Sequence, residues 1–286
     1  MKIASIDIGT NAIKSKVFNT TPTSIDFIEG IRSPIRLGTE VFNSGKLSDQ
    51  KLNELSKTLK KYQKIFIKDD IKMYEIVATS AFRDTHNSED ARRYVENKIN
   101  HPIRIISGLE EAQLMRFHPK AQLGNNKVFV DVGGGSTEIY IYKNNHHIIQ
   151  SFQLGAVRSM LNKDKKSEWE RLREWLSKQN KVDTLVGLGG SIKSFLNIIE
   201  SKKISTKIFK EEADKLKRMS QQDKIDNLGL QPDRADVIDY ALNIYFEIIN
   251  NLNVQKIKST KWGVSDSMAV KTFHELYSKK ISIYKD

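Results

Sequence analysis

The fold is decided by a pattern that the chain contains twice, as Ile3-Ala4-Ser5-Ile6-Asp7-Ile8-Gly9-Thr10 and as Val128-Phe129-Val130-Asp131-Val132-Gly133-Gly134-Gly135-Ser136-Thr137. Each copy is an apolar run with one carboxylate, followed by a glycine turn and hydroxyl side chains. Alternating residues typical of a further strand follow both turns, over 12–18 and 138–142. Each turn therefore joins strand to strand, whereas a dinucleotide-binding fold or a P-loop joins a strand to a helix. The repeat predicts two related halves.

The order of the predicted elements supports this duplication. In the first half, further strands are expected at 25–31, 74–79 and 103–107, and helices at 88–98 and from about Glu110. A helix with Ser48 as its N-cap is expected between the third and fourth strands, and its apolar face is marked by Leu52, Leu55, Leu59 and Phe66. In the second half, strands are expected at 147–153 and 183–188, helices at 167–179 and 191–200, then mostly helix, with an apolar stretch at 257–262 returning to the sheet. The polar segment 118–126 is the best boundary. We therefore predict domains 1–125 and 126–286, and allow for the last helix packing back on the first domain.

Composition limits the class of protein. The chain has 286 residues, 38% of them hydrophobic, and no cysteine, which excludes disulfides, thiolate metal sites and cysteine nucleophiles. Asp7 interrupts the first apolar run, so no signal peptide is expected, and no stretch approaches the roughly 20 apolar residues of a membrane helix. We therefore expect a cytoplasmic protein with no membrane partner. The net charge of +12 is spread over both halves, which suits either general solubility or attraction of polyanions.

The repeated segments contain the residues for metal and phosphate chemistry. Asp7, Asp131 and Glu138 are hard oxygen donors suited to Mg²⁺ or Mn²⁺, and the last two flank one predicted hairpin. The glycines let the backbone approach phosphate oxygens, and neighbouring polar side chains add donors. The predicted phosphate-binding residues of these turns are Gly9, Thr10, Asn11, Gly133, Gly134, Gly135, Ser136 and Thr137. A lone aspartate at a strand end is usually only solvated, but two in twin motifs favour a site. Hairpin loops that bind phosphate from two facing lobes predict an α/β protein of two ribonuclease-H-like (actin-like ATPase) domains with a cleft between them.

Several segments in order resemble the exopolyphosphatase / guanosine pentaphosphate phosphatase family in its short form. They are Ile6–Asn11, Ala78–Arg83, Ile106–Ala112, Asp131–Glu138 and Leu188–Ser191, with weaker matches at Leu154–Val157 and Asp233–Ile238. The resemblance implies that Glu111 is the catalytic base, with Glu110 the lesser candidate, and that Arg83, Gly190 and Ser191 contact phosphate. The chain departs from the family pattern at two places. The segment beginning at Gly263-Val264 lacks the family's arginine, and Gly190-Ser191 stands where the family has Gly-Thr.

The resemblance implies a phosphoanhydride hydrolase, and four functions remain to be compared. The favoured one is an exopolyphosphatase that releases orthophosphate from inorganic polyphosphate. The nearest alternative is hydrolysis of guanosine pentaphosphate (pppGpp) to the tetraphosphate, which needs a base-binding pocket. A kinase of the acetate or sugar type and a non-catalytic polyanion binder are further alternatives on the same fold. No motif for specific nucleic-acid binding is present, and the sequence leaves a homodimer open.

Overall fold

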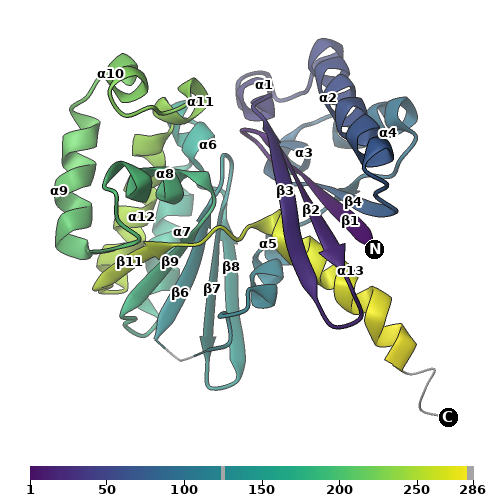
Figure 1. The fold of residues 1–286 in the computed structure, drawn as a ribbon. Helices are drawn as coiled ribbons and strands as arrows, with labels where there is room; N and C mark the ends of the chain where they lie inside the picture. Colours follow the sequence, from purple (N-terminus) through teal and green to yellow (C-terminus); the bar gives the residue numbers. More distant parts are fainter. Residues whose placement is uncertain (124–125, 282–286) are drawn as a thin grey trace. The chain divides into compact units, whose positions relative to one another are not determined.

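The computed structural model describes residues 1–123 and 126–281. The chain forms two compact units (Figure 1). Unit 1 contains Met1–Ser107 together with the chain from Val264 onward, and unit 2 contains Gly108–Gly263. The chain therefore crosses between the units twice. The units begin and end at other residues than the predicted domains 1–125 and 126–286, because the segment after Gly108 packs on strands of unit 2 and the last helix packs on strands of unit 1.

Unit 1 is built on a five-stranded sheet in the order β3-β2-β1-β4-β5. The first three strands form antiparallel pairs, whereas β4 runs parallel to β1 and β5 runs parallel to β4. Its elements are β1 (Lys2–Ile8), β2 (Ile13–Thr20), β3 (Ile25–Ser33), α1 (Leu37–Ser44), α2 (Asp49–Lys68), β4 (Met73–Ala78), α3 (Ser80–Asp84), α4 (Ser88–Ile99), β5 (Arg104–Ile105) and α13 (Val264–Ile281).

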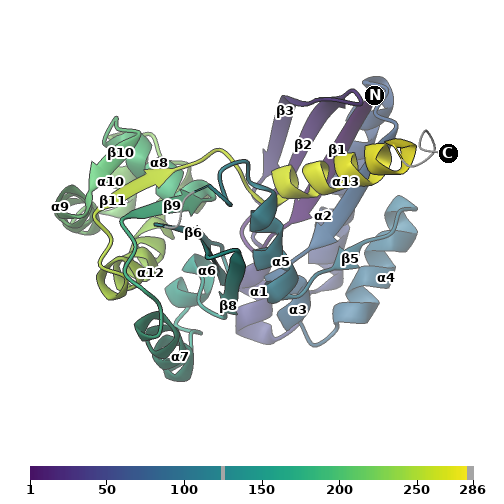
Figure 2. The same ribbon diagram turned by 90° about the horizontal axis from the view of Figure 1, so that it is seen from below.

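The two faces of this sheet have different partners, because successive residues of a strand point to opposite sides. From β1, Ile6 and Ile8 belong to the main core together with residues of α2 and α4. Ile3, on the other face, packs with Ala269 of α13, and Figure 2 shows α13 lying along that face of the strands. Asp7 has the same parity as Ile3 and therefore lies on the α13 face.

Polar contacts anchor the start of α13 on this face. The Oγ of Ser5 donates a hydrogen bond to the carbonyl of Ser265 at 2.7 Å, and Lys16 pairs with Asp266 at 2.5 Å. Asp266 lies in the first turn of the helix, where a carboxylate is also favoured by the helix dipole.

Unit 2 repeats the same sheet order with one extra edge strand. Read from β8, the order is β8-β7-β6-β9-β11-β10, with antiparallel pairing through β8-β7-β6 and parallel pairing from β6 to β9 and β11. Its elements are α5 (Gly108–Leu114), the 3₁₀ helix η1 (Met115–Phe117), β6 (Lys127–Val132), β7 (Thr137–Lys143), β8 (His146–Phe152), α6 (Ala156–Met160), α7 (Lys166–Ser177), β9 (Thr184–Leu188), α8 (Gly190–Ile198), β10 (Lys203–Ser205), α9 (Thr206–Lys217), α10 (Gln221–Asp226), α11 (Pro232–Ala235), α12 (Ile238–Asn251) and β11 (Lys256–Ser259).

The two sheets confirm the duplicated α/β fold predicted from the repeated motif. In each, the segment with the aspartate is the central strand, and the glycine turn joins it to an antiparallel neighbour. The apolar stretch near 257–262 does return to the second sheet, as β11. In α7, Leu172 and Leu176 are fully buried, whereas Trp169 is half-buried.

Candidate active site

The hairpin of β6 and β7 places two carboxylates side by side. Asp131 and Glu138 are direct cross-strand partners, an arrangement in which the Cβ atoms lie about 5 Å apart on one face. Glu138 is only 1% exposed, and its Oε1 accepts a hydrogen bond from the Oγ of Ser151 at 2.9 Å. The two residues of this hairpin that were predicted to bind one ion therefore lie side by side.

Helix α5 packs on β7 and β8, on the side of the sheet that carries these two acids. Phe129 and Tyr140, which have the same strand parity as Asp131 and Glu138, form a core cluster with Met115 of the adjoining η1. Burial raises the pKa of Tyr140 to about 12. Within α5, Glu110 is exposed and Glu111 is half-buried. The two predicted candidates for the base therefore differ in environment, and Glu111 is the more enclosed.

The triple-glycine turn after β6 is held against the start of α6. The carbonyl of Gly133 accepts from the Ala156 amide at 2.9 Å, and the carbonyl of Gly135 accepts from Nε of Arg158 at 2.8 Å. A Cβ at Gly155 would lie 2.5 Å from backbone atoms of Gly135, so only glycine allows this approach. The turn is therefore held by hydrogen bonds and close backbone packing on α6.

The predicted phosphate ligands at the end of this turn differ in what they can offer. Ser136 is buried, and its carbonyl accepts from the Gly133 amide at 2.9 Å. Thr137 is fully buried and donates from Oγ1 to the Leu154 carbonyl at 2.6 Å. That bond uses the only hydroxyl proton of Thr137, so the side chain cannot also donate to a phosphate. Its role is to stabilise the end of the turn.

A second loop, between β9 and α8, contacts Asp131. Gly189 has a φ of +78°, and a Cβ there would lie 2.5 Å from Oδ1 of Asp131. A Cβ at the next residue, Gly190, would lie 2.3 Å from Nη2 of Arg234. The other end of that guanidinium, Nη1, donates to Oγ of Ser191 at 2.8 Å. The backbone of the two glycines is therefore enclosed between a carboxylate and a guanidinium.

In unit 1, the turn after β1 is equally tight. The amide of Gly9 donates to the Ala12 carbonyl at 3.2 Å, and a Cβ at Gly9 would lie 2.9 Å from that same oxygen. Thr10 is 3% exposed, and its Oγ1 has no hydrogen-bond partner among the residues that the structure describes. Asn11 accepts at Oδ1 from Nε of Arg36 at 3.0 Å. A buried hydroxyl without a partner is costly unless a ligand satisfies it.

Arg83 lies beside this turn in the sheet order. Ile8 pairs with Ala78, so the carboxyl ends of β1 and β4 are neighbours. Arg83 follows β4 on the short helix α3, where its Nη1 donates to the Ile106 carbonyl at 2.9 Å. The predicted phosphate contacts of unit 1 thus come from adjacent strand ends.

The carboxylates of unit 2 suit a divalent cation better than the carboxylate of the corresponding hairpin in unit 1. No three histidine, aspartate or glutamate side chains gather into a metal-binding group within residues 1–123 and 126–281. Mg²⁺ is usually held by one or two carboxylates and several waters, which Asp131 and Glu138 satisfy. Asp7 faces Lys14 across its hairpin, with Nζ 3.9 Å from Oδ2. That lysine makes the Asp7 hairpin less suited to a cation.

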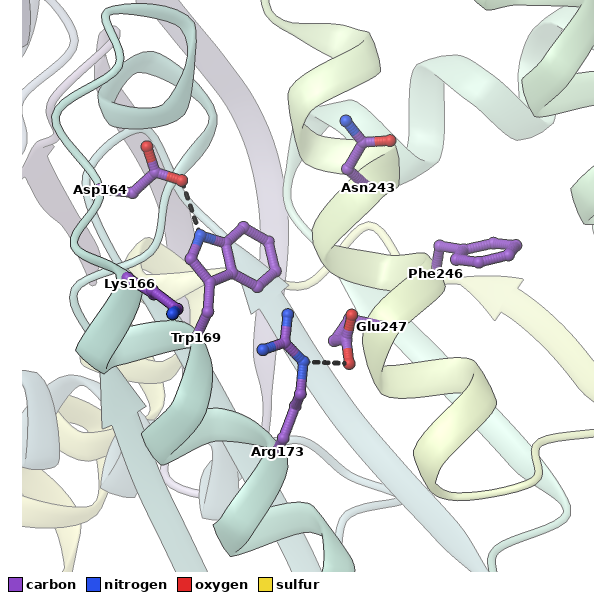
Figure 3. Close-up of a pocket in the computed structure, with 7 residues that line it drawn as sticks. All are labelled: Asp164, Lys166, Trp169, Arg173, Asn243, Phe246 and Glu247. Atoms are coloured by element: carbon purple, nitrogen blue, oxygen red, sulfur yellow. Dashed lines mark hydrogen bonds and ion pairs between the residues drawn. The ribbon is translucent and has the colours of Figure 1, made fainter.

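A groove elsewhere in unit 2 contains none of the predicted site residues. It has a volume of about 580 Å³ and lies between α7 and α12 (Figure 3), lined by Asp164, Lys166, Trp169, Arg173, Asn243, Phe246 and Glu247. The indole of Trp169 donates to Asp164 at 2.7 Å, and Arg173 pairs with Glu247 at 2.9 Å. Of the four charged side chains that line the groove, Asp164, Arg173 and Glu247 are therefore engaged within it, and Lys166 lies 3.7 Å from Glu170.

Sequence reasoning assigned no role to several residues that hold the loops in place. These are Gly155, Arg158, Gly189, Arg234 and Tyr245. The hydroxyl of the fully buried Tyr245 contacts the carbonyls of the residues before Asp131 and Gly189, at 3.3 and 3.2 Å. Burial, with the Asp131 charge second, raises the pKa of that phenol. Three of the five lie in or beside the two weaker motif segments, which was the available signal.

The chain belongs to the Ppx/GppA phosphatase family, whose family model matches residues 16–276. Its fold is similar to that of the Aquifex aeolicus family member, with a TM-score of 0.75 at 22% identity over 100% of this chain and 99% of that one. It is also similar to an exopolyphosphatase from Cytophaga hutchinsonii, with a TM-score of 0.83 at 17% identity over 96% and 98% of the two chains. These comparisons confirm the resemblance and the fold class.

A curated relative is longer. The bifunctional 3-dehydroquinate synthase/phosphatase of Fusobacterium nucleatum is 29% identical over 86% of this chain, and the match covers 43% of that protein. The chain thus spans less than half the length of that relative. Separately, none of the helices within the described part of the chain is long and apolar enough to cross a membrane.

Proposed function

We propose that this protein is an exopolyphosphatase, which hydrolyses the terminal phosphoanhydride bond of inorganic polyphosphate and releases orthophosphate. Membership of a phosphatase family supports hydrolysis of a phosphate bond. The observation that carries the proposal is the paired arrangement of Asp131 and Glu138 beside the triple-glycine turn. Two carboxylates next to a closely packed glycine turn suit a phosphate group that arrives with a cation.

The proposed division of roles follows the chemistry of the reaction. A water oxygen attacks the terminal phosphorus, the bond to the bridging oxygen breaks, and that oxygen leaves with the shortened chain. Glu111, which the family resemblance implies as the base, takes the proton of the water. It is also the more enclosed of the two glutamates of α5. Arg83 and the turn at Gly9–Asn11 bind phosphate oxygens, and the unpartnered Oγ1 of Thr10 supports this assignment.

The cofactor that we propose is Mg²⁺ or Mn²⁺, held by Asp131 and Glu138. Asp7 was predicted as a third ligand and stays a candidate, although its neighbour Lys14 disfavours it. When bound, the cation would neutralise charge on the phosphate oxygens. The close approach of Gly189 restricts the position of the Asp131 carboxylate.

Phosphate release from polyphosphates of several lengths and from pppGpp, with and without Mg²⁺, tests the proposal. We expect release from polyphosphate that depends on the metal. Activity confined to pppGpp would establish the alternative, a pppGpp phosphohydrolase cutting the same bond type. Phosphorylation of an acceptor by ATP would instead indicate a kinase, and tight polyanion binding without turnover would indicate a binding protein.

A further inference from the structure

The loop between β9 and α8 contacts the carboxylate of Asp131 through bare backbone. Gly189 has the left-handed φ of +78°, and its missing side chain leaves room for Oδ1 of Asp131, which a Cβ would approach to 2.5 Å. The position of this backbone therefore limits how the carboxylate can rotate. Whatever fixes the loop also fixes the direction of the carboxylate.

Arg234 fixes this loop from the opposite side. Its Nη1 donates to Oγ of Ser191, which is 2% exposed, and its Nη2 occupies the space that a Cβ of Gly190 would need. A planar guanidinium that contacts a loop at two points resists rotation better than a single ammonium does. Pro232, at the start of the short α11, sets the backbone from which the arginine projects.

The charges on the two sides of the loop are opposite. The carboxylate of Asp131 lies against Gly189, and the guanidinium of Arg234 lies against Gly190, the next residue of the loop. Tyr245 contacts the carbonyls of Val130 and Leu188, the residues before Asp131 and Gly189. The loop is thus held at its strand end and at its helix end.

We propose that Arg234 is a positioning residue that holds the Gly189–Ser191 loop against Asp131 and thereby orients that carboxylate for a divalent cation. The proposal rests on the proposed function for the role of Asp131. Ser191, predicted from the family resemblance to contact phosphate, acts in this arrangement as the acceptor through which Arg234 holds the loop.

Binding of Mn²⁺ alone, measured by calorimetry without substrate, tests this arrangement. We expect Arg234→Gln to raise the Mn²⁺ dissociation constant about tenfold, the lower end of what loss of such supporting contacts costs. Ser191→Ala should weaken binding less. The double variant should be no weaker than Arg234→Gln, because both changes break one contact. Arg234→Lys, which keeps the charge, should recover only part of the affinity.

Arg173→Gln is the matched control, since Arg173 is a partly exposed arginine of the same unit whose partner is Glu247. It should bind Mn²⁺ like the wild type. Circular dichroism melting of each variant separates loss of binding from loss of folding, and Ser191→Ala gives a mild second test if Arg234→Gln is unfolded. Unchanged affinity in folded Arg234→Gln, or no binding by the wild type, would overturn the proposal. Failure of phosphate release with the binding pattern intact would overturn the proposed reaction and leave the role of Arg234 standing.

Discussion

The buried side chain of His118 should make the free energy of unfolding depend on pH. The ring is 9% exposed and lies between Phe129 and Trp262, with ring centroids 5.0 and 5.3 Å away. Its Nδ1 accepts a hydrogen bond from the Lys120 amide at 3.0 Å. That nitrogen is therefore unprotonated, and Nε2 carries the hydrogen and donates to Oγ1 of Thr260 at 3.2 Å.

Protonation of this ring is disfavoured in the folded chain. Burial, helped by nearby lysines, lowers the pKa of His118 from 6.5 to about 4. The unfolded chain therefore binds the proton first as the pH falls, so this histidine reduces stability between about pH 6.5 and pH 4 and has no such effect above that window. At about 1.4 kcal/mol per pKa unit, the full loss is about 3 kcal/mol, of which about 2 kcal/mol falls between pH 7 and pH 5.

Urea unfolding followed by tryptophan fluorescence at pH 7 and pH 5 measures this term. Carboxylates also titrate there, so the comparison is between the wild type and His118→Gln, which removes the titrating ring. The wild type should lose about 2 kcal/mol more than the variant over this pH range. The exposed His146 provides the control, because His146→Gln should behave like the wild type. An equal loss in the wild type and His118→Gln would refute the reasoning.

Three further changes test the site and its supports. Glu111→Gln should lower phosphate release by roughly 10²–10⁴-fold with substrate affinity within a few fold, whereas Glu110→Gln should retain most turnover; the reverse result would exchange their roles. Gly155→Ala places a Cβ 2.5 Å from the triple-glycine turn and should cost about 3 kcal/mol in urea unfolding. Gly229→Ala, at φ +65° with open space around it, should cost only about 1 kcal/mol, and similar costs would argue against the steric account. Tyr245→Phe removes a hydroxyl that contacts the carbonyls of Val130 and Leu188 and should lower stability by about 1 kcal/mol, with no loss expected if those contacts are negligible.

The fold could be predicted because its signals are local. The apolar runs at 3–8 and 128–132 predict strands, and the alternating residues at 12–18 and 138–142, in place of a helix pattern after each glycine turn, exclude the competing nucleotide folds. Helix α2 begins where its N-cap predicts, with the hydroxyl of Ser48 accepting from the Lys51 amide. The unit boundaries were harder to predict, because which sheet a helix such as α5 or α13 covers depends on contacts distant in sequence.

The supports of the site could not be predicted for the same reason. Gly155 and Arg158 come after β8, two strands beyond the triple-glycine turn, and their roles depend on the approach of α6 to that turn. Arg234 meets Ser191 only because α11 returns across the start of α8. Spacing along the chain carries no information on such contacts. Thr137 is the opposite case: the sequence predicted a phosphate contact, but its buried hydroxyl stabilises the turn instead.

The two motifs that look alike in sequence are chemically different in the structure. Each aspartate has a cross-strand partner seven residues later in its hairpin, which is Glu138 for Asp131 but Lys14 for Asp7. A second carboxylate raises the affinity of a site for a divalent cation, whereas an ammonium lowers it and favours an anion. The residue opposite the aspartate is thus basic in unit 1 and acidic in unit 2. A cation is therefore expected to depend far more on the hairpin of unit 2, and Asp131→Asn should weaken Mn²⁺ binding much more than Asp7→Asn does. Equal weakening by both substitutions would show that the two hairpins act as equivalent ligands.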